Sequence, residues 1–207
     1  DRASPDSKNA SSPITVASIV KLRTAEVVRQ SIGNLQEHIV IEQDDFPGGS
    51  NAGLRPGDIV TVEDALSAML LRSGNEAACA LARVVGGILS PGATSEEALH
   101  RFAKEMGAGY GNSWGRGLLT AVEVANLALD VANDPTLVAL LSASNRTISI
   151  VGRNSRELQI ENRVNRWRSI LPGFIFAKTG TGSWKASVVV VWRHGTDTYA
   201  SAILSTS

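Results

Sequence analysis

Apolar residues recur every three to four positions through the first two thirds of the chain. After a polar, Ser-rich lead-in over residues 1–12, this spacing predicts a helix over residues 17–31 that ends at Gly33. Thr61 is followed by two acidic residues, which is typical of a helix cap, and the glycine-rich stretch 107–117 predicts a loop. The further helices that this spacing predicts span residues 65–71, 75–86, 95–106, 120–132 and 135–142.

After Asn145 the period of the apolar residues falls to two, which is typical of strands. Helices placed between sheet segments predict an α+β fold, with an antiparallel sheet flanked by helices. We expect one domain over residues 1–207, with a helical lobe over 34–145 and a sheet lobe made of 1–33 and 146–207. The expected strands are 38–43, 147–151, 158–161, 174–181, 186–193 and 198–205, the last two joined by a tight turn.

The composition narrows the range of partners. Twenty basic and twenty acidic residues cancel, so no net charge draws the chain to nucleic acid or to an anionic membrane. No apolar run is long enough for a transmembrane helix, and residues 1–12 lack the pattern of a signal peptide. A single Cys79 and three scattered histidines offer no metal-ligand spacing, so we expect neither a metal nor another cofactor.

The stretch Ser18-Ile-Val-Lys21 contains side chains suited to acyl transfer. Residues three apart share one helix face, so the lysine can reach the serine hydroxyl. A serine hydroxyl is a weak nucleophile until a base takes its proton, and a lysine with a lowered pKa can do so. Such a pair also arises by chance about once in a chain of this length, and alone it is a weak signal.

Two later motifs complement this pair. Ser73-Gly74-Asn75 lies between two expected helices, where the serine could pass a proton and the amide could both donate and accept toward a peptide bond. Lys178-Thr179-Gly180-Thr181 ends an expected strand, where a lysine and two hydroxyls beside a glycine could hold a carboxylate. A helix stop with a cap and an ordinary strand end would give the same two sequences.

The three motifs follow one another in the order found in penicillin-binding proteins and class A β-lactamases. The chain resembles the low-molecular-mass penicillin-binding proteins, the serine D-Ala-D-Ala carboxypeptidases. This resemblance runs through nearly the whole sequence, over residues 13–22, 53–58, 62–66, 70–78, 117–118, 162–165 and 177–180.

The resemblance implies roles for the residues of the first two motifs. Ser18 would be acylated with Lys21 as its base, while Ser73 and Asn75 would line the cleft. It implies a D-Ala-D-Ala carboxypeptidase that acts on peptidoglycan stem peptides and is acylated by β-lactam antibiotics. It also implies a periplasmic or extracytoplasmic location, and it allows membrane anchoring through segments that lie outside this chain.

The resemblance further implies how the end of the substrate is held. Lys178, Thr179 and Thr181, with Gly180 between them, would bind the terminal carboxylate, and backbone N–H groups of Ser18 and Thr181 would form the oxyanion hole. Because side chains alternate along a strand, the two threonines should share one face, with Lys178 on the other and directed toward Ser73.

The sequence departs from the family pattern in two places. The family usually begins with a β-hairpin before the first motif and closes with a helix, so we expect a sheet shortened at its ends. Many members also place an arginine near the last hairpin to hold the carboxylate. Residues 195–199 contain none, which leaves that role to hydroxyls or to Arg193.

Three alternatives stay open at this point. A class A-like β-lactamase needs a loop glutamate, yet residues 108–119 contain no acid and the nearest are Glu105 and Glu123. A non-catalytic peptidoglycan-binding or sensor module would be marked by loss of the first serine or lysine, and both are present.

The third alternative is an α/β-hydrolase. Gly111-Asn-Ser-Trp-Gly115 fits the pattern G-x-S-x-G, and Asp130 and His194 follow it in the order of a hydrolase triad. That motif needs a strand before the serine and a helix after it, whereas here a helix precedes it and a glycine-rich coil follows.

Overall fold

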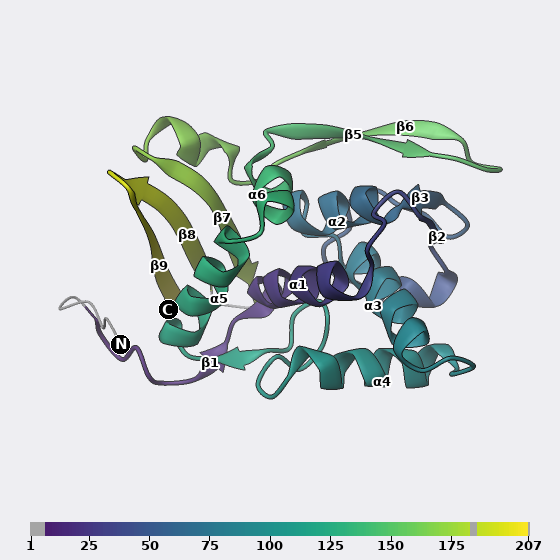
Figure 1. Cartoon of the computed structure of the whole chain (residues 1–207), viewed down its shortest axis with the longest axis horizontal. Helices are drawn as coiled ribbons and strands as arrows, with labels where there is room; N and C mark the ends of the chain where they lie inside the picture. The colour runs from purple at the N-terminus through teal and green to yellow at the C-terminus, as the bar shows by residue number, and fades with distance from the viewer. Residues whose placement is uncertain (1–6, 183–185, 207) are drawn as a thin grey trace.

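The computed structural model describes residues 7–182 and 186–206, and it contains a three-stranded antiparallel sheet with the strand order β7-β8-β9 (Figure 1). These strands are β7 (Phe174–Thr181), β8 (Ala186–His194) and β9 (Asp197–Thr206). Thr181 is paired with Ala186 at one end of the sheet, and His194 with Asp197 at the other. Helix α5 (Ala121–Ala132) packs against β8 and β9, and α6 (Pro135–Ser142) packs against β7.

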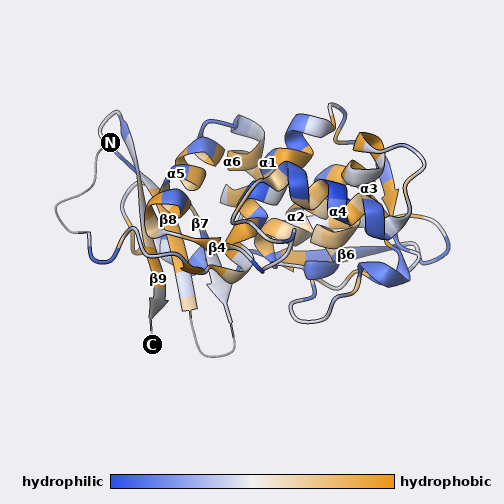
Figure 2. Cartoon of the chain, turned by 90° about the horizontal axis from the view of Figure 1, so that it is seen from below, coloured by the Kyte–Doolittle hydropathy of each residue, from blue (hydrophilic) through white to orange (hydrophobic). Residues whose placement is uncertain are grey.

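Helix α1 (Lys21–Ser31) lies in the middle of the molecule and packs against four other helices (Figure 1). The chain enters it through a 3-10 turn, η1 (Ala17–Val20), so the predicted helix over 17–31 is present but its first four residues are wound more tightly. Figure 2 shows the apolar sides of the helices turned toward one another. The neighbours of α1 are α2 (Val62–Leu71), α3 (Asn75–Leu89), α4 (Ser95–Met106) and α5.

Side chains that bind free backbone N–H groups fix where these helices begin. Thr61 caps α2 by accepting a hydrogen bond from the N–H of Asp64, as its sequence predicts. Thr94 and Thr120 form capping boxes with glutamates three residues later, and Asp134 caps α6, which has Pro135 in its first turn. These caps explain why the predicted bounds of the last three helices agree with the structure to within one residue.

The remaining strands form three separate two-stranded sheets. The pair β5–β6 packs against α2 and β3. The predicted strand 38–43 is shorter than expected, because residues 43–45 wind into a 3-10 turn, η2 (Gln43–Asp45), that Glu42 caps. The pairs are β1 (Ile14–Thr15) with β4 (Leu118–Leu119), β2 (His38–Val40) with β3 (Ile59–Thr61), and β5 (Asn145–Ile150) with β6 (Arg156–Glu161). A last 3-10 turn, η3 (Asn165–Ser169), precedes β7.

The predicted α+β architecture is confirmed, whereas the division into two lobes stays a prediction.

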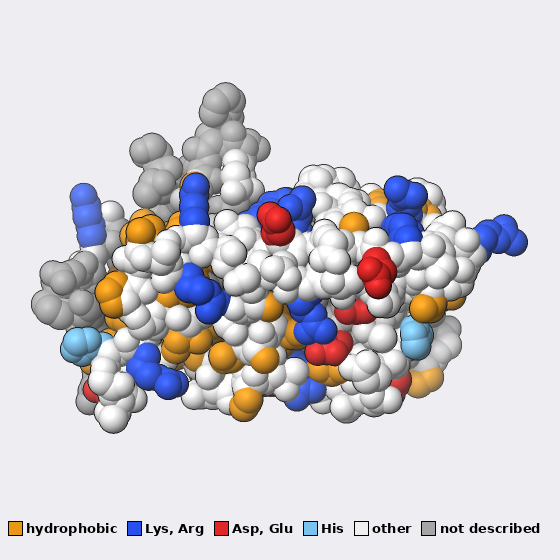
Figure 3. Space-filling model, turned by 90° about the horizontal axis from the view of Figure 1, so that it is seen from above, with side chains coloured by type: hydrophobic (Ala, Val, Ile, Leu, Met, Phe, Trp, Pro, Cys, Tyr) orange, Lys and Arg blue, Asp and Glu red, His pale blue; other side chains and the backbone are white. Residues whose placement is uncertain are grey.

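Basic and acidic side chains are interspersed on the face shown in Figure 3. None of the described helices is by itself long and apolar enough to cross a membrane. Only α5 and α6 taken together, with a bend of 103° between them, reach that length and composition.

Candidate active site

Ser18 lies in the η1 turn, directly after strand β1. Ala17 has a φ of 48°, in the left-handed region that residues other than glycine seldom adopt, so the chain bends sharply just before the serine. Strand β7 comes so close at this point that a Cβ on Gly180 would lie 2.2 Å from the carbonyl oxygen of Val16. The glycine therefore lets β7 approach the chain next to Ser18.

Lys21 is the centre of the site. Its ammonium nitrogen donates to Ser18 Oγ at 2.9 Å, to Asn75 Oδ1 at 2.6 Å and to the carbonyl oxygen of Trp114 at 3.0 Å. The side chain is fully buried, and burial lowers the pKa of Lys21 from 10.5 to about 7. The lysine can therefore be neutral near pH 7, which is the condition for taking the proton of Ser18.

Ser73 lies in the loop between α2 and α3, and Asn75 is the first residue of α3. Ser73 is buried and has a φ of 63°, a second strained backbone position at the site. Asn75 is fixed on three sides: its Oδ1 accepts from Lys21, its Nδ2 donates to Gly48 O at 2.7 Å, and its N–H donates to Ser50 O at 2.8 Å. The amide orientation is thus set by its neighbours.

Lys178 joins the third motif to the second. Its ammonium nitrogen donates to Ser73 Oγ at 3.0 Å, the contact expected from the sequence. The lysine is buried, whereas Thr181 is exposed, as the alternation of the strand predicts. Burial, with a smaller contribution from the nearby Lys21 charge, holds the pKa of Lys178 well below its usual range.

The structure thus brings all three motifs into one hydrogen-bonded group. Lys21 connects the first motif to the second, and Lys178 connects the second to the third. The group contains two serine hydroxyls, each beside a lysine of lowered pKa: Ser18 beside Lys21, and Ser73 beside Lys178. It also contains the end of strand β7, which carries two threonines. This arrangement is suited to forming and breaking an acyl ester.

Sequence reasoning missed the contribution of the loop over 107–117. The carbonyl of Trp114 is the third acceptor of Lys21, and a backbone carbonyl leaves no trace in the residue type. Asn112 holds that loop in shape, because its Oδ1 accepts from the N–H groups of Trp114, Gly115 and Arg116. A second missed residue is Arg163, an exposed cation that donates to Ser50 Oγ at 3.3 Å and lowers the pKa of both Lys21 and Lys178.

The alternative G-x-S-x-G motif does not form a nucleophile site. Ser113 is buried, and helix α4 and a loop precede it where a hydrolase needs a strand. Its carbonyl accepts from Thr24 Oγ1 at 2.8 Å, so the segment is part of the packing under α1. His194 lies at the hairpin end of β8. The hydrolase alternative is therefore wrong.

The structure also corrects the suggestion that Arg193 holds the carboxylate. Arg193 is paired with Thr198 near the hairpin between β8 and β9, while Thr181 is paired with Ala186 at the opposite end of β8. Seven residues of extended strand separate the two ends, a distance of about 23 Å. Arg193 is therefore too far from Thr181 to share a ligand with it.

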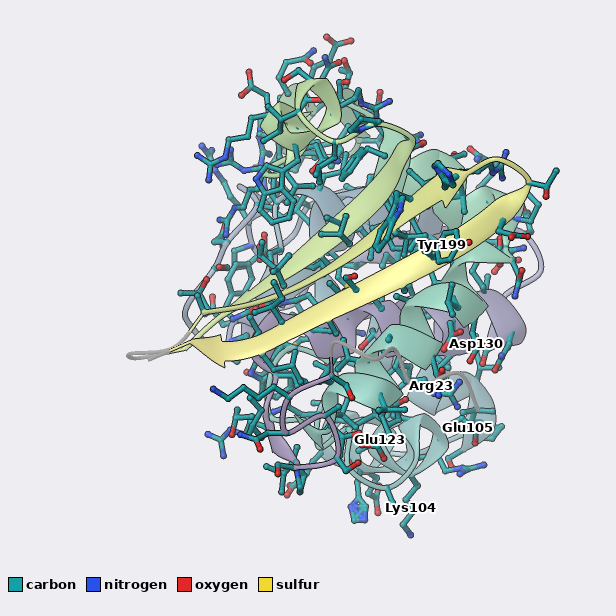
Figure 4. The ribbon with its side chains drawn as sticks, turned by 90° about the vertical axis from the view of Figure 1, so that its left-hand side faces the viewer. Arg23, Lys104, Glu105, Glu123, Asp130 and Tyr199 are labelled. Atoms are coloured by element: carbon teal, nitrogen blue, oxygen red, sulfur yellow. The ribbon has the colours of Figure 1, made fainter. Side chains whose placement is uncertain are left out.

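A hollow of about 510 Å³ lies apart from these motifs, between α1, α5 and the loop over 107–117. Arg23, Glu123 and Asp130 lie together in it (Figure 4). Arg23 already donates to the carbonyls of Met106 and Glu105 and pairs with Glu26, so its guanidinium N–H groups stabilise the fold. A smaller cavity of about 100 Å³ adjoins the site, and the loop over 46–51 lines it together with Asn75 and Glu76.

Comparisons with known proteins agree with this geometry. Residues 6–92 match the model of the peptidase S11 family, described as D-alanyl-D-alanine carboxypeptidase. No curated protein sequence matches the chain.

Solved structures match over nearly the whole chain. One mutant of the Streptomyces K15 DD-transpeptidase has a TM-score of 0.86 at 24% identity, covering 97% of this chain and 84% of that one. A second mutant of that enzyme has a TM-score of 0.84 at 25% identity, covering 97% and 85%. D-alanyl-D-alanine carboxypeptidase from Mycobacterium tuberculosis H37Rv has a TM-score of 0.74 at 20% identity, covering 95% and 75%.

The chain thus has the fold of the penicillin-binding DD-peptidases, and the predicted fold class is confirmed. The predicted resemblance is confirmed as well. The match of residues 6–92 to the family model supports a serine enzyme of the D-Ala-D-Ala carboxypeptidase type.

Proposed function

We propose that this protein is a serine D-Ala-D-Ala carboxypeptidase that removes the terminal D-alanine from peptidoglycan stem peptides. The observation that carries this proposal is the 2.9 Å hydrogen bond between Lys21 Nζ and Ser18 Oγ, made by a buried lysine whose pKa is lowered to about 7. Serine and base are in hydrogen-bond contact, and the base is poised near neutral pH.

Acylation begins when the Ser18 hydroxyl transfers its proton to neutral Lys21. Ser18 Oγ then bonds to the carbonyl carbon of the penultimate D-alanine, and the oxyanion is stabilised by the backbone N–H groups of Ser18 and Thr181. When the C–N bond breaks, the leaving amine takes the proton held by Lys21, with the Ser73 hydroxyl as the relay. The products of this step are free D-alanine and an acyl ester on Ser18.

Deacylation returns the enzyme to its starting state. Water bonds to the acyl carbon, gives its proton to Lys21, and the ester bond to Ser18 Oγ breaks as the serine regains a proton. Asn75 is held between Lys21 and Gly48, and its fixed amide orients the scissile peptide during acylation and the acyl chain during deacylation. Lys178 supports the relay through its hydrogen bond to Ser73.

The carboxylate of the substrate is held by the end of β7. Thr181 is exposed and Thr179 is half-buried on that strand, and Gly180 leaves room for the substrate backbone. Their hydroxyls lie on the face opposite to the buried Lys178. Arg163, which donates to Ser50 Oγ, adds positive potential and lowers the pKa of Lys178.

The β-lactam antibiotics acylate Ser18 in this proposal, because their strained amide takes the place of the peptide bond. Rapid β-lactamase activity is disfavoured, because it needs a glutamate as the base for deacylation and the two nearest ones are engaged elsewhere. Glu105 is paired with Arg101, and Glu123 accepts hydrogen bonds from Thr120 at the start of α5. The carboxyl group nearest to the site in sequence, that of Glu76, is buried and accepts a hydrogen bond from the N–H of Ala52, so it is engaged in the fold. A purely binding module is disfavoured by the intact pair of Ser18 and Lys21.

A cell-wall substrate implies an extracytoplasmic location, as is general for the family. Attachment to a membrane through a segment outside these 207 residues stays a prediction.

The direct test combines a stem-peptide substrate ending in D-Ala-D-Ala with a fluorescent penicillin. We expect release of one D-alanine per peptide and a stoichiometric, slowly released penicillin adduct. Rapid turnover of the penicillin would favour the β-lactamase instead. Absence of both adduct and D-alanine would favour a binding module.

A further inference from the structure

Glu76 is a buried carboxyl group beside the active site that the proposed mechanism does not use. It directly follows Asn75 at the start of α3 and is only 1% exposed. Burial raises the pKa of Glu76, although the hydrogen bond from the Ala52 N–H acts in the opposite sense. Burying a carboxyl group costs free energy unless it is hydrogen-bonded.

Backbone N–H groups of the loop over 46–54 contact the carboxyl group, and the shortest of these hydrogen bonds comes from Ala52. Glu76 Oε1 accepts a hydrogen bond of 2.6 Å from the N–H of Ala52, while Oε2 has no hydrogen-bond partner among the described residues. The packing around this bond is tight, because a Cβ on Gly74 would lie 2.9 Å from Ala52 Cβ and 3.0 Å from Glu76 Oε2. The bond therefore joins the loop to the start of α3 at a tightly packed point, where neither segment can shift without a steric clash.

The same loop supplies the partners of Asn75. Gly48 O accepts from the side-chain amide of Asn75, and Ser50 O accepts from its backbone N–H. Asn75 in turn presents Oδ1 to Lys21 at 2.6 Å. A displacement of the loop would remove the acceptor of Asn75 Nδ2, and the amide could then rotate away from the lysine.

We propose that Glu76 is a positioning residue: by holding Ala52, its carboxyl oxygen fixes the loop over 46–54 and thereby the orientation of Asn75 toward Lys21. The role requires an acceptor oxygen at this distance from α3, and it does not require a charge. This inference rests on the proposed function only for its effect on acylation, since the effect on the loop is a property of the fold.

Three substitutions separate these requirements. Glu76→Gln keeps the length and the acceptor oxygen, so acylation by penicillin should stay within about threefold of the unaltered protein. Glu76→Asp keeps the charge but withdraws the oxygen by one methylene, and Glu76→Ala removes it. Both should slow acylation about ten- to a hundred-fold, the range for a lost buried hydrogen-bond partner. If Glu76→Ala does not fold, the comparison of Gln with Asp still decides the question.

The matched control is Asp64→Asn, at another buried carboxyl with a raised pKa in the first turn of a helix, α2. It should not slow acylation more than about twofold, and the melting temperature of every variant shows whether a slower rate follows from positioning or from general stability.

Hydrogen exchange of residues 46–54 tests the inference without any enzyme activity. Exchange of the Ala52 and Asn75 N–H groups should be faster in Glu76→Asp and Glu76→Ala, and unchanged in Glu76→Gln and Asp64→Asn. If the loop responds in this way but no variant forms an adduct, the proposed function fails and the positioning role stands. Unchanged exchange in Glu76→Asp, or a Gln variant as slow as the Asp variant, would overturn the positioning role.

Discussion

Lys178 Nζ donates a 3.0 Å hydrogen bond to Ser73 Oγ and so joins strand β7 to the loop between α2 and α3. The two residues are far apart in sequence and both are buried, so the contact depends on the whole fold. Ser73 also has a strained backbone, with a φ of 63°. A strained, buried residue that meets a lysine of lowered pKa is typical of a functional site.

This contact predicts strong coupling between the two side chains. Ser73→Ala and Lys178→Met should each slow penicillin acylation, and the double variant should be little slower than the worse single variant. Residues in direct contact commonly show an interaction energy of about 0.5–3 kcal/mol in such a cycle. The measurement is the second-order acylation rate of all four proteins. Strictly additive losses would show that Lys178 does not act through Ser73.

The lowered pKa of Lys21 predicts the pH dependence of acylation. The neutral amine is the active form, and it predominates above the pKa of about 7, so the rate should rise with pH and reach half its maximum near pH 7. The measurement is the acylation rate of the free enzyme across pH 5–9 in buffers of constant ionic strength.

Lys21→Arg gives the matching variant. A guanidinium stays protonated throughout this pH range, so this protein should be nearly inactive and its residual rate should not rise near pH 7. An arginine variant that acylates at close to the normal rate would refute the role of Lys21 as base.

The position of Thr181 at the end of β7 predicts that the effect of replacing it depends on whether the substrate has a free terminal carboxylate. Thr181→Val removes an exposed hydroxyl from the end of β7 and keeps a β-branched side chain of similar size. Loss of a hydrogen bond to a charged group costs about 1.5–3 kcal/mol, or roughly ten- to a hundred-fold in kcat/KM. The loss should appear with peptides that end in a free carboxylate and nearly vanish with an amidated analogue. Equal losses on both substrates would exclude Thr181 as a carboxylate ligand.

Much of the fold could be predicted from the sequence because its helices carry local signals. The helix Ser95–Met106 begins after the capping box of Thr94 and Glu97, and α6 begins after Asp134 and Pro135. By contrast, the 3-10 turn over Ala17–Val20 was missed. Its shape depends on β7, which passes beside Val16 and comes from the other end of the sequence.

The candidate site was predicted where side chains carry the chemistry and missed where the backbone does. The pair Ser18–Lys21 followed from residue type and spacing, whereas the contact of Lys178 with Ser73 followed from the family resemblance and the alternation of the strand. The structure brings both pairs into hydrogen-bond contact. The carbonyl of Trp114 left no sequence signal. The suggestion of Arg193 failed for another reason, since the register of the β8–β9 hairpin places it at the far end of the strand.

The central claim is that Ser18 is the nucleophile, and locating the penicillin adduct tests it most directly. The protein is incubated with penicillin, digested, and the modified residue is identified by mass spectrometry, with Ser18→Ala as the matched variant. We predict one adduct, on Ser18, and neither adduct nor D-alanine release from Ser18→Ala, whose melting temperature should stay within a few degrees of the unaltered protein. An adduct on any other residue, such as Ser113, or an adduct that persists in Ser18→Ala would contradict the account.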